Sequence, residues 1–246
     1  MRSGIRHPQL GKNLYLHPVV PVPALYKEEV KAWSGAMMTS TNDEYIQLEG
    51  RYGYKIETPP PHSGLLALGM PWNSPQFFEE KMKSIRNMGV FIVLGRDEFT
   101  GRIALSKDGR PQIHYQLHAA DQKRLMHGMM NAARIHAAAG AQEIALPHVR
   151  PTFLPSEIVQ DEKAFQQAVD ALRWKKGDFT LFSAHQMGTC RMGTNYSESV
   201  VRPDGQVWNV PGLYVMDASV FPVCSGVNPM VSILAVVDWM CRQHGL

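Results

Sequence analysis

Residues 90–117 read VFIVLGRDEFTGRIALSKDGRPQIHYQL, and this stretch decides the fold class. The apolar run at 90–94 has the length of a strand, and two further segments of strand length follow at 102–105 and 112–117. Asp108 and Gly109 lie between those two runs, and Asp-Gly between alternating segments is typical of a hairpin turn. The stretch therefore predicts consecutive antiparallel strands.

The sequence on either side of this stretch favours further strands and three amphipathic helices. Helices are expected from Pro75 to Met88, from about Asp121 to Ala139, and from Glu162 to Trp174, where apolar residues recur at three- and four-residue steps. Strands are expected at 44–48 and 52–56, and 65–68 is a further candidate. The prolines of the first thirty residues force extended backbone, so we expect a strand or arm that runs over a surface. We predict an α+β fold, an antiparallel sheet with helices on one side.

The second helix carries methionines and histidines that invite a ligand-binding interpretation. Its Met126, Met129 and Met130 have the spacing of ordinary core packing, which we prefer. Its histidines and the one just before it, at 118, 127 and 136, recur every nine residues and so alternate between faces. No metal site is therefore expected.

Composition excludes several classes of protein. The 246 residues are 44% hydrophobic and 19% charged, which is typical of a folded globular chain. The net charge of +3 is spread along the sequence, so nucleic acid is not an expected partner. No apolar run approaches the ~20 residues that a membrane-spanning helix needs, and no secretory signal is visible. The three cysteines, Cys190, Cys224 and Cys241, are odd in number for a disulfide framework and too few for a structural zinc site without histidines. We expect them to be small buried side chains in a reducing compartment.

Three segments near the C-terminus carry the residues best suited to chemistry. They read SAHQMGTCRMG at 183–193, LYVMDASVFP at 213–222 and SGVNPM at 225–230. His185 precedes a Gly-Thr turn, so its ring can face a cleft, although a structural histidine is the commoner case. Asp217 ends a predicted buried strand, where it can contact a ligand or cap the next turn. A hydrolase based on Cys190 and His185 is disfavoured, because no oxyanion loop accompanies them.

The ordered set HxxGTCxMG, LYVxDASVFP and SGVNPM resembles the closing segment of the glucose-methanol-choline (GMC) family of flavin-dependent oxidoreductases. Near the N-terminus, residues 10–18 (LGKNLYLHP) resemble the LGxNLxxHP segment of that family. The middle of the chain is most similar to the long-chain fatty alcohol oxidase branch. The resemblance implies the C-terminal portion of an FAD enzyme.

Site residues follow from the resemblance one position at a time. His185 and Asn228 match the catalytic pair, with His185 as the base for the hydroxyl proton and Asn228 as a hydrogen-bond donor to the substrate oxygen. Asp217, Ala218, Asn228, Pro229 and Met230 match the flavin contacts. The helix expected after Pro229 points its N-terminus toward the ring. The implied reaction converts a long-chain primary alcohol and O2 to an aldehyde and H2O2; a dehydrogenase with another acceptor is the near alternative.

One family element has no counterpart here, the N-terminal GxGxxG that holds the nucleotide half of FAD. We therefore expect 1–24 and 176–246 to be partial pieces of an FAD-binding, Rossmann-like domain, flanking a substrate-binding sheet domain at 25–175. The alternative is a truncated, non-catalytic fragment or interaction module that needs a separate nucleotide-binding half. The expected partners are a small-molecule alcohol and the missing N-terminal half of the same enzyme. The expected location is intracellular, with membrane association implied by the resemblance.

Overall fold

The computed structural model describes residues 3–150, 152–175, 177–178 and 180–245. The chain forms two compact units, each assembled from separated segments. Unit 1 consists of Met1–His17, Arg96–Asp121 and Ser183–Leu246, and unit 2 consists of Pro18–Gly95 and Gln122–Phe182. These units differ from the proposed division at residues 24 and 176. The strand that follows His17 joins the sheet of unit 2, and the segment after Gly95 leaves it.

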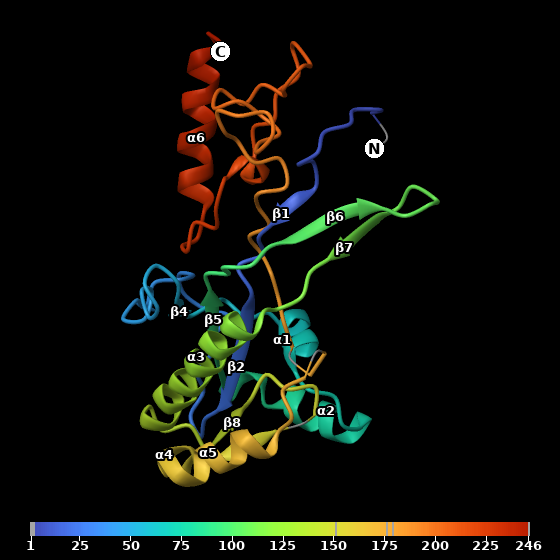
Figure 1. Cartoon of the computed structure of the whole chain (residues 1–246). Coiled ribbons are helices and arrows are strands. Elements are labelled where there is room, and N and C mark those ends of the chain that lie inside the picture. Colours follow the sequence, from blue (N-terminus) through green and yellow to red (C-terminus); the bar gives the residue numbers. More distant parts are fainter. Residues whose placement is uncertain (1–2, 151, 176, 179, 246) are drawn as a thin grey trace. The chain divides into compact units, whose positions relative to one another are not determined.

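Unit 2 is built on a six-stranded antiparallel sheet with the strand order β3-β4-β5-β2-β8-β9. Figure 1 labels four of these strands, β4, β5, β2 and β8. Its strands are β2 (Val19–Leu25), β3 (Thr41–Asn42), β4 (Tyr54–Glu57), β5 (Met88–Gly95), β8 (Glu143–Ala145) and β9 (Phe153–Pro155). Its helices are α1 (Ser63–Gly69), α2 (Pro75–Lys83), the 3-10 turn η1 (Ile85–Asn87), most of α3 (Ala119–Ala138), α4 (Ser156–Gln160) and α5 (Glu162–Ala171). The predicted α+β class with an antiparallel sheet is confirmed.

β2 is a central, buried strand, although it contains two prolines. The expected extended segment is present as a strand, but it lies inside the sheet and not over a surface. It pairs with β5 along its whole length, from Val19 opposite Leu94 to Leu25 opposite Met88. Pro21 and Pro23 occupy alternate positions, on the side where the neighbouring strand β8 pairs only with the last two residues of β2. Because no ladder bond is required there, the missing proline N–H groups cost nothing.

Helix α3 packs on one face of this sheet. Leu125 and Met129 are buried, as expected for a helix that contributes to the core. Gly128 allows the close approach, because a Cβ at this position would lie 2.4 Å from Cγ1 of Val93. On the other face, Leu66 of α1 packs in a cluster with Met88. Short helices thus contribute to the second face as well.

Two short predictions in unit 2 are wrong. The alternating residues 44–48 form turns, and 65–68 belongs to helix α1. His62 caps that helix by accepting the Gly64 N–H at its Nδ1, a local bond that favours the helical start. A short apolar run has no period of its own to separate strand from helix.

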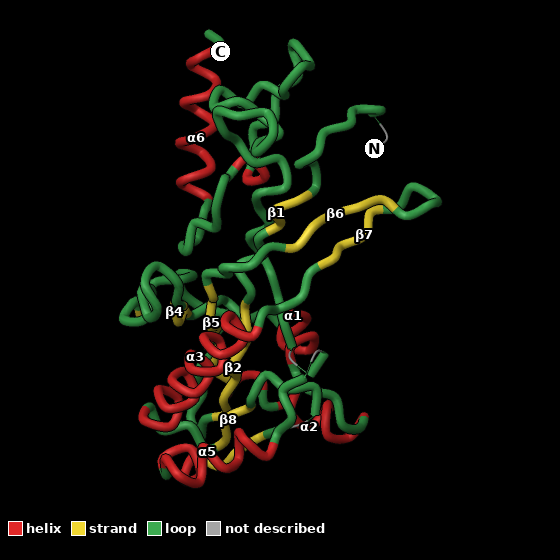
Figure 2. The backbone as a smooth tube through the Cα atoms, viewed as in Figure 1, coloured by secondary structure: helices red, strands yellow, loops and turns green. Residues whose placement is uncertain are grey.

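Unit 1 has little regular structure (Figure 2). It contains a three-stranded sheet with the order β1-β6-β7, the 3-10 turn η2 and helix α6. Their bounds are β1 (Lys12–Leu14), β6 (Gly101–Leu105), β7 (Pro111–His114), η2 (Ala218–Val220) and α6 (Met230–Gln243). The predicted hairpin is present, with Gly109 at a φ of +79° in its turn. A small core of Val200, Val201, Val207, Val220 and Met240 lies beneath α6.

No helix within the described residues is long and apolar enough to cross a membrane.

Candidate active site

The N-terminal and C-terminal motifs lie side by side in unit 1. Tyr15 and Met187 exchange backbone hydrogen bonds of 2.9 and 3.0 Å, and the Gly11 N–H donates to the Thr189 carbonyl over 2.9 Å. Gly188 has a φ of +89°, and a Cβ there would lie 2.2 Å from the Asn13 carbonyl oxygen. Only glycine therefore permits the approach that brings His185 to the N-terminal segment.

The second motif is bound to the first. The Gly188 N–H donates to the Ala218 carbonyl, and the Cys190 N–H donates to the Ser219 carbonyl over 2.9 Å. The predicted buried strand at 213–216 is absent: Leu213 is 39% exposed, and Tyr214 forms only an isolated bridge. Backbone bonds between loops, rather than a strand, position this segment.

His185 contacts a second histidine that is fully buried. The Nδ1 atoms of His17 and His185 are 3.2 Å apart, and their rings meet edge to face. The other nitrogen of His17, Nε2, accepts the backbone N–H of Gly226 over 2.8 Å. Asn228 is two residues further along the same loop. One imidazole thus ties the segment of His185 to the loop that carries Asn228.

A buried carboxylate holds the backbone of His17. Asp97 accepts the N–H of Leu16 over 2.8 Å and that of His17 over 3.3 Å. It also accepts the thiol of Cys224 over 3.0 Å and the hydroxyl of Tyr115 over 3.4 Å. Burial raises the pKa of Asp97, and the hydrogen bonds from Cys224 and from the backbone act in the opposite direction.

Burial sets the protonation of the neighbouring groups. It lowers the pKa of His17 to about 3, and the positive charges that His185 and Arg96 can carry act in the same direction. Burial, with the nearby charge of Asp97, raises the pKa of the Cys224 thiol and that of Tyr115. At physiological pH, His17 is therefore a neutral ring, and Cys224 and Tyr115 are hydrogen-bond donors.

The other predicted site residues lie in loops or at helix starts. Asp217 is exposed and caps η2 by accepting the Ser219 N–H over 2.7 Å, the alternative role considered for it. Asn228 is exposed, and Pro229 is the buried N-cap residue of α6. Met230 begins that helix with 70% of its surface exposed.

Sequence reasoning missed the roles of His17, Asp97 and Cys224. His17 stands in the LGKNLYLHP motif, so the resemblance drew attention to the segment without assigning the ring. Asp97 follows the apolar strand 90–94, and a charged residue after a buried strand is a signal for a site. Cys224 was expected only to be a small buried side chain. Among the described residues, no group of three or more potential ligands is arranged to hold a metal ion.

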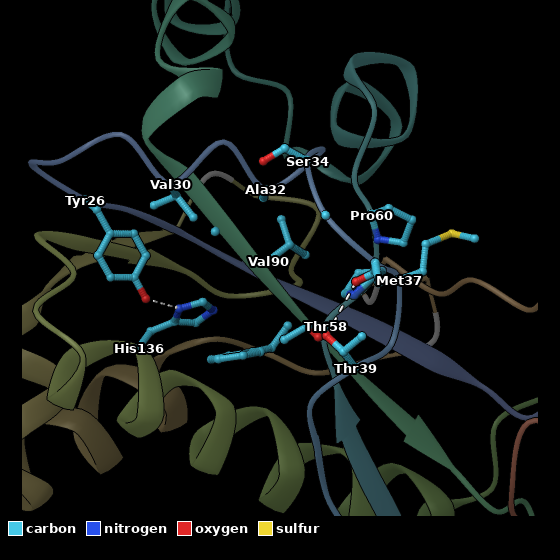
Figure 3. A pocket seen from close by; sticks show the side chains of 15 residues that line it. Tyr26, Val30, Ala32, Ser34, Met37, Thr39, Thr58, Pro60, Val90 and His136 are labelled. Atoms are coloured by element: carbon cyan, nitrogen blue, oxygen red, sulfur yellow. Dashed lines mark hydrogen bonds between the residues drawn. The ribbon is translucent and has the colours of Figure 1, made fainter.

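Unit 2 contains a separate pocket of about 360 Å³ (Figure 3). It arises because the strand β4 ends at Glu57 and the prolines at 59–61 cannot continue its ladder with β5. At one end, the Tyr26 hydroxyl donates to Nδ1 of His136 over 2.7 Å, and Nε2 of His136 donates to the Val22 carbonyl over 2.8 Å. Thr39, Thr58, Met37 and Pro60 line the other end, with apolar side chains between.

Comparison with known proteins identifies the family. A family model described as GMC oxidoreductase matches residues 97–236, more than half of the chain. The chain therefore belongs to the GMC oxidoreductases, a family of FAD-dependent enzymes.

Individual relatives agree with this assignment. The chain is 35% identical to long-chain-alcohol oxidase FAO4A of Arabidopsis thaliana, over 96% of this chain and 33% of that protein. It is 31% identical to long-chain-alcohol oxidase FAO4B of the same plant, over 95% of this chain and 32% of the relative. The chain thus spans about one third of the length of the curated relatives that it matches.

Solved structures share the fold at low sequence identity. Pyridoxine 4-oxidase from Mesorbium loti matches with a TM-score of 0.64 and 16% identity, over 98% of this chain and 45% of that one. A variant of formate oxidase from Aspergillus oryzae matches with a TM-score of 0.60 and 15% identity, over 98% of this chain and 48% of that one.

The residues present suit the ring end of FAD better than its nucleotide end. Helix α6 presents an apolar stripe to the outside, on which Met230, Val231 and Leu234 are each more than 60% exposed. The N-terminus of this 14-residue helix has no side-chain cap. A planar ring with a partial negative charge fits an uncapped helix start beside apolar side chains. The nucleotide end lacks its glycine motif in this chain.

Proposed function

We propose that this chain serves the FAD-dependent oxidation of a primary alcohol to an aldehyde. The observation that carries the proposal is the hydrogen-bonded chain from Gly226 through His17 to His185, which links the catalytic histidine to the loop of Asn228. When bound, FAD supplies the acceptor for the hydride that leaves the alcohol carbon.

The proposed catalytic pair, His185 and Asn228, has two distinct roles in the reaction. His185 takes the hydroxyl proton as the hydride leaves, because an imidazole can accept a proton near physiological pH. The Asn228 amide cannot titrate and donates a hydrogen bond that holds the substrate oxygen as its negative charge develops. Ala218, Asp217, Pro229 and Met230 are proposed contacts of the cofactor.

The finer proposal is a long-chain fatty alcohol as substrate and O2 as acceptor, giving H2O2. It is supported by the similarity to two Arabidopsis proteins named as long-chain-alcohol oxidases, and by the apolar side chains that line the pocket in unit 2. Because a long alkyl chain partitions into lipid, we also propose that the protein works inside the cell at a membrane surface.

The test begins with the purified chain, incubated with excess FAD and desalted. A retained flavin absorbance band is expected, and anaerobic addition of 1-dodecanol should then bleach it. His185→Ala should slow the bleaching by about 10²–10⁴-fold while the flavin stays bound. His244→Ala is the matched control, because that histidine bonds to Asp204 at the far end of α6 and should leave the rate unchanged. Equal rates in the two variants would refute the role of His185.

A second candidate follows from the exposed stripe on α6 and from the one-third coverage of the relatives. In this proposal the chain is a non-catalytic module until a separate nucleotide-binding half covers the stripe. Apolar stripes of this kind mark protein interfaces. Light scattering after gel filtration tests it: self-association that Val231→Lys and Leu234→Lys abolish is expected. A monomer that retains FAD would exclude this candidate.

A further inference from the structure

The proton positions in the His17–His185 pair follow from a single fixed donor. The Gly226 backbone N–H can only donate, so Nε2 of His17 must be the acceptor in their 2.8 Å bond. His17 is neutral at physiological pH because burial lowers its pKa to about 3. Its one ring proton therefore lies on Nδ1, which faces Nδ1 of His185 at 3.2 Å.

The same reasoning reaches His185. Its Nδ1 must accept the proton of His17, so in its neutral form the proton of His185 lies on Nε2. If His185 instead carried a proton on Nδ1, that N–H would need an acceptor at Nδ1 of His17. The proton of His17 would then move to Nε2, where it would face the Gly226 N–H. Two donors cannot share a 2.8 Å contact, so the Gly226 bond would have to break.

The surroundings of His17 favour a functional role over a merely structural one. Its φ of +47° lies in the left-handed region, which a non-glycine residue adopts only when its neighbours enforce it. Both carboxylate oxygens of Asp97 hold the backbone there. On the other side, Gly226 is enclosed, since a Cβ would lie 2.8 Å from Cδ of Arg96. Arg96 itself donates to the Cys224 carbonyl over 3.1 Å.

We propose that His17 is a positioning residue that keeps the proton of neutral His185 on Nε2 and couples any proton on Nδ1 of His185 to release of the Gly226 amide. Through this coupling, the loop of Asn228 responds to the protonation of His185. The inference rests on the proposed function only for the catalytic meaning of His185. With the protons placed in this way, Nε2 of His185 is a donor. Accepting a substrate proton at that atom requires the proton of His185 to move to Nδ1 and the Gly226 bond to open.

The direct test is a multiple-bond ¹H–¹⁵N correlation spectrum of the ¹⁵N-histidine-labelled chain at pH 8, without FAD or substrate. His17→Asn and His185→Asn assign the two rings by loss of their signals. We expect a protonated Nε2 and an unprotonated Nδ1 in His185, with the reverse in His17. A proton on Nδ1 of His185 in the unsubstituted chain would overturn the proposal.

A matched pair of variants tests whether His17 sets this tautomer. Asparagine and aspartate have the same shape and tolerate the left-handed backbone, but only asparagine can donate to His185. His17→Asn should keep the proton of His185 on Nε2, and His17→Asp should move it to Nδ1. The same tautomer in both folded variants would overturn the proposal; if the aspartate variant does not fold, the spectrum of the unsubstituted chain decides.

The coupling is tested by the Gly226 amide signal during a pH titration. We expect it to shift with the midpoint of the His185 ring, and to stop doing so in His185→Asn. A second titratable group, the carboxyl of Asp97, also lies beside His17. The backbone amides of Leu16 and His17, which donate to it, report on its titration separately. Cys224 and Tyr115 stay protonated in this range because burial raises their pKa values. A Gly226 amide that does not follow His185 would refute the coupling. Turnover enters none of these readouts, so failure of the proposed function is a distinguishable result.

Discussion

Gly188→Ala should be among the most destabilising glycine-to-alanine substitutions in unit 1. The left-handed φ of +89° costs an alanine about 1–2 kcal/mol. The new Cβ would also lie 2.2 Å from the carbonyl oxygen of Asn13, a backbone atom that cannot rotate away. Moving it would break the two hydrogen bonds between Tyr15 and Met187, each contributing about 1 kcal/mol. We expect a total loss of about 3–4 kcal/mol.

Gly212→Ala is the matched control. Gly212 belongs to the same unit and has a φ of +80°, but its Cβ would meet no atom within 4 Å. It should therefore cost only the backbone contribution, about 1–2 kcal/mol. The difference of about 2 kcal/mol corresponds to roughly a 30-fold change in the opening equilibrium.

Hydrogen exchange measured by mass spectrometry separates the two variants. Peptides covering 11–17 and 185–193 should exchange faster in Gly188→Ala than in Gly212→Ala, by roughly 30-fold. Peptides from α3 in unit 2 provide an internal reference that should not change. Equal exchange in the two variants would refute the argument that the close approach to Asn13 requires glycine.

Two further predictions concern protonation. Burial lowers the pKa of His136 to about 4, so between that value and 6.5 the unfolded state binds more protons, and the free energy of unfolding falls as the pH falls. Between pH 7 and pH 5, the titration of His136 should lower the free energy of unfolding of unit 2 by about 2 kcal/mol. Urea unfolding followed on peptides from α3 should show this loss. An equal loss in His136→Gln would contradict the prediction. Cys224 is buried, and burial raises the pKa of its thiol. Ellman's reagent should therefore label Cys190 and Cys241 in the folded chain before Cys224. Mass spectrometry of the labelled peptides checks this order, and early labelling of Cys224 would count against it.

Local chemistry determined several elements of this protein from the sequence alone. The hairpin turn at Asp108-Gly109 needs only a glycine with positive φ between two alternating runs, and the structure has it. Helices α3 and α6 follow from long apolar periodicity and from their end signals, glycine after the first and proline before the second. In these elements the deciding interactions join residues a few positions apart.

Tertiary structure decided the rest. The prolines of β2 were compatible with a surface arm, and the placement of β8 allows them inside the sheet. The motifs pointed to His185 and Asn228, but the ring between their segments is His17, which is 168 positions from His185 in sequence. A contact across such a separation forms only when packing closes the intervening chain, and a local pattern carries no record of that closure. The proton on His185 therefore depends on a backbone amide that only the folded unit brings to His17.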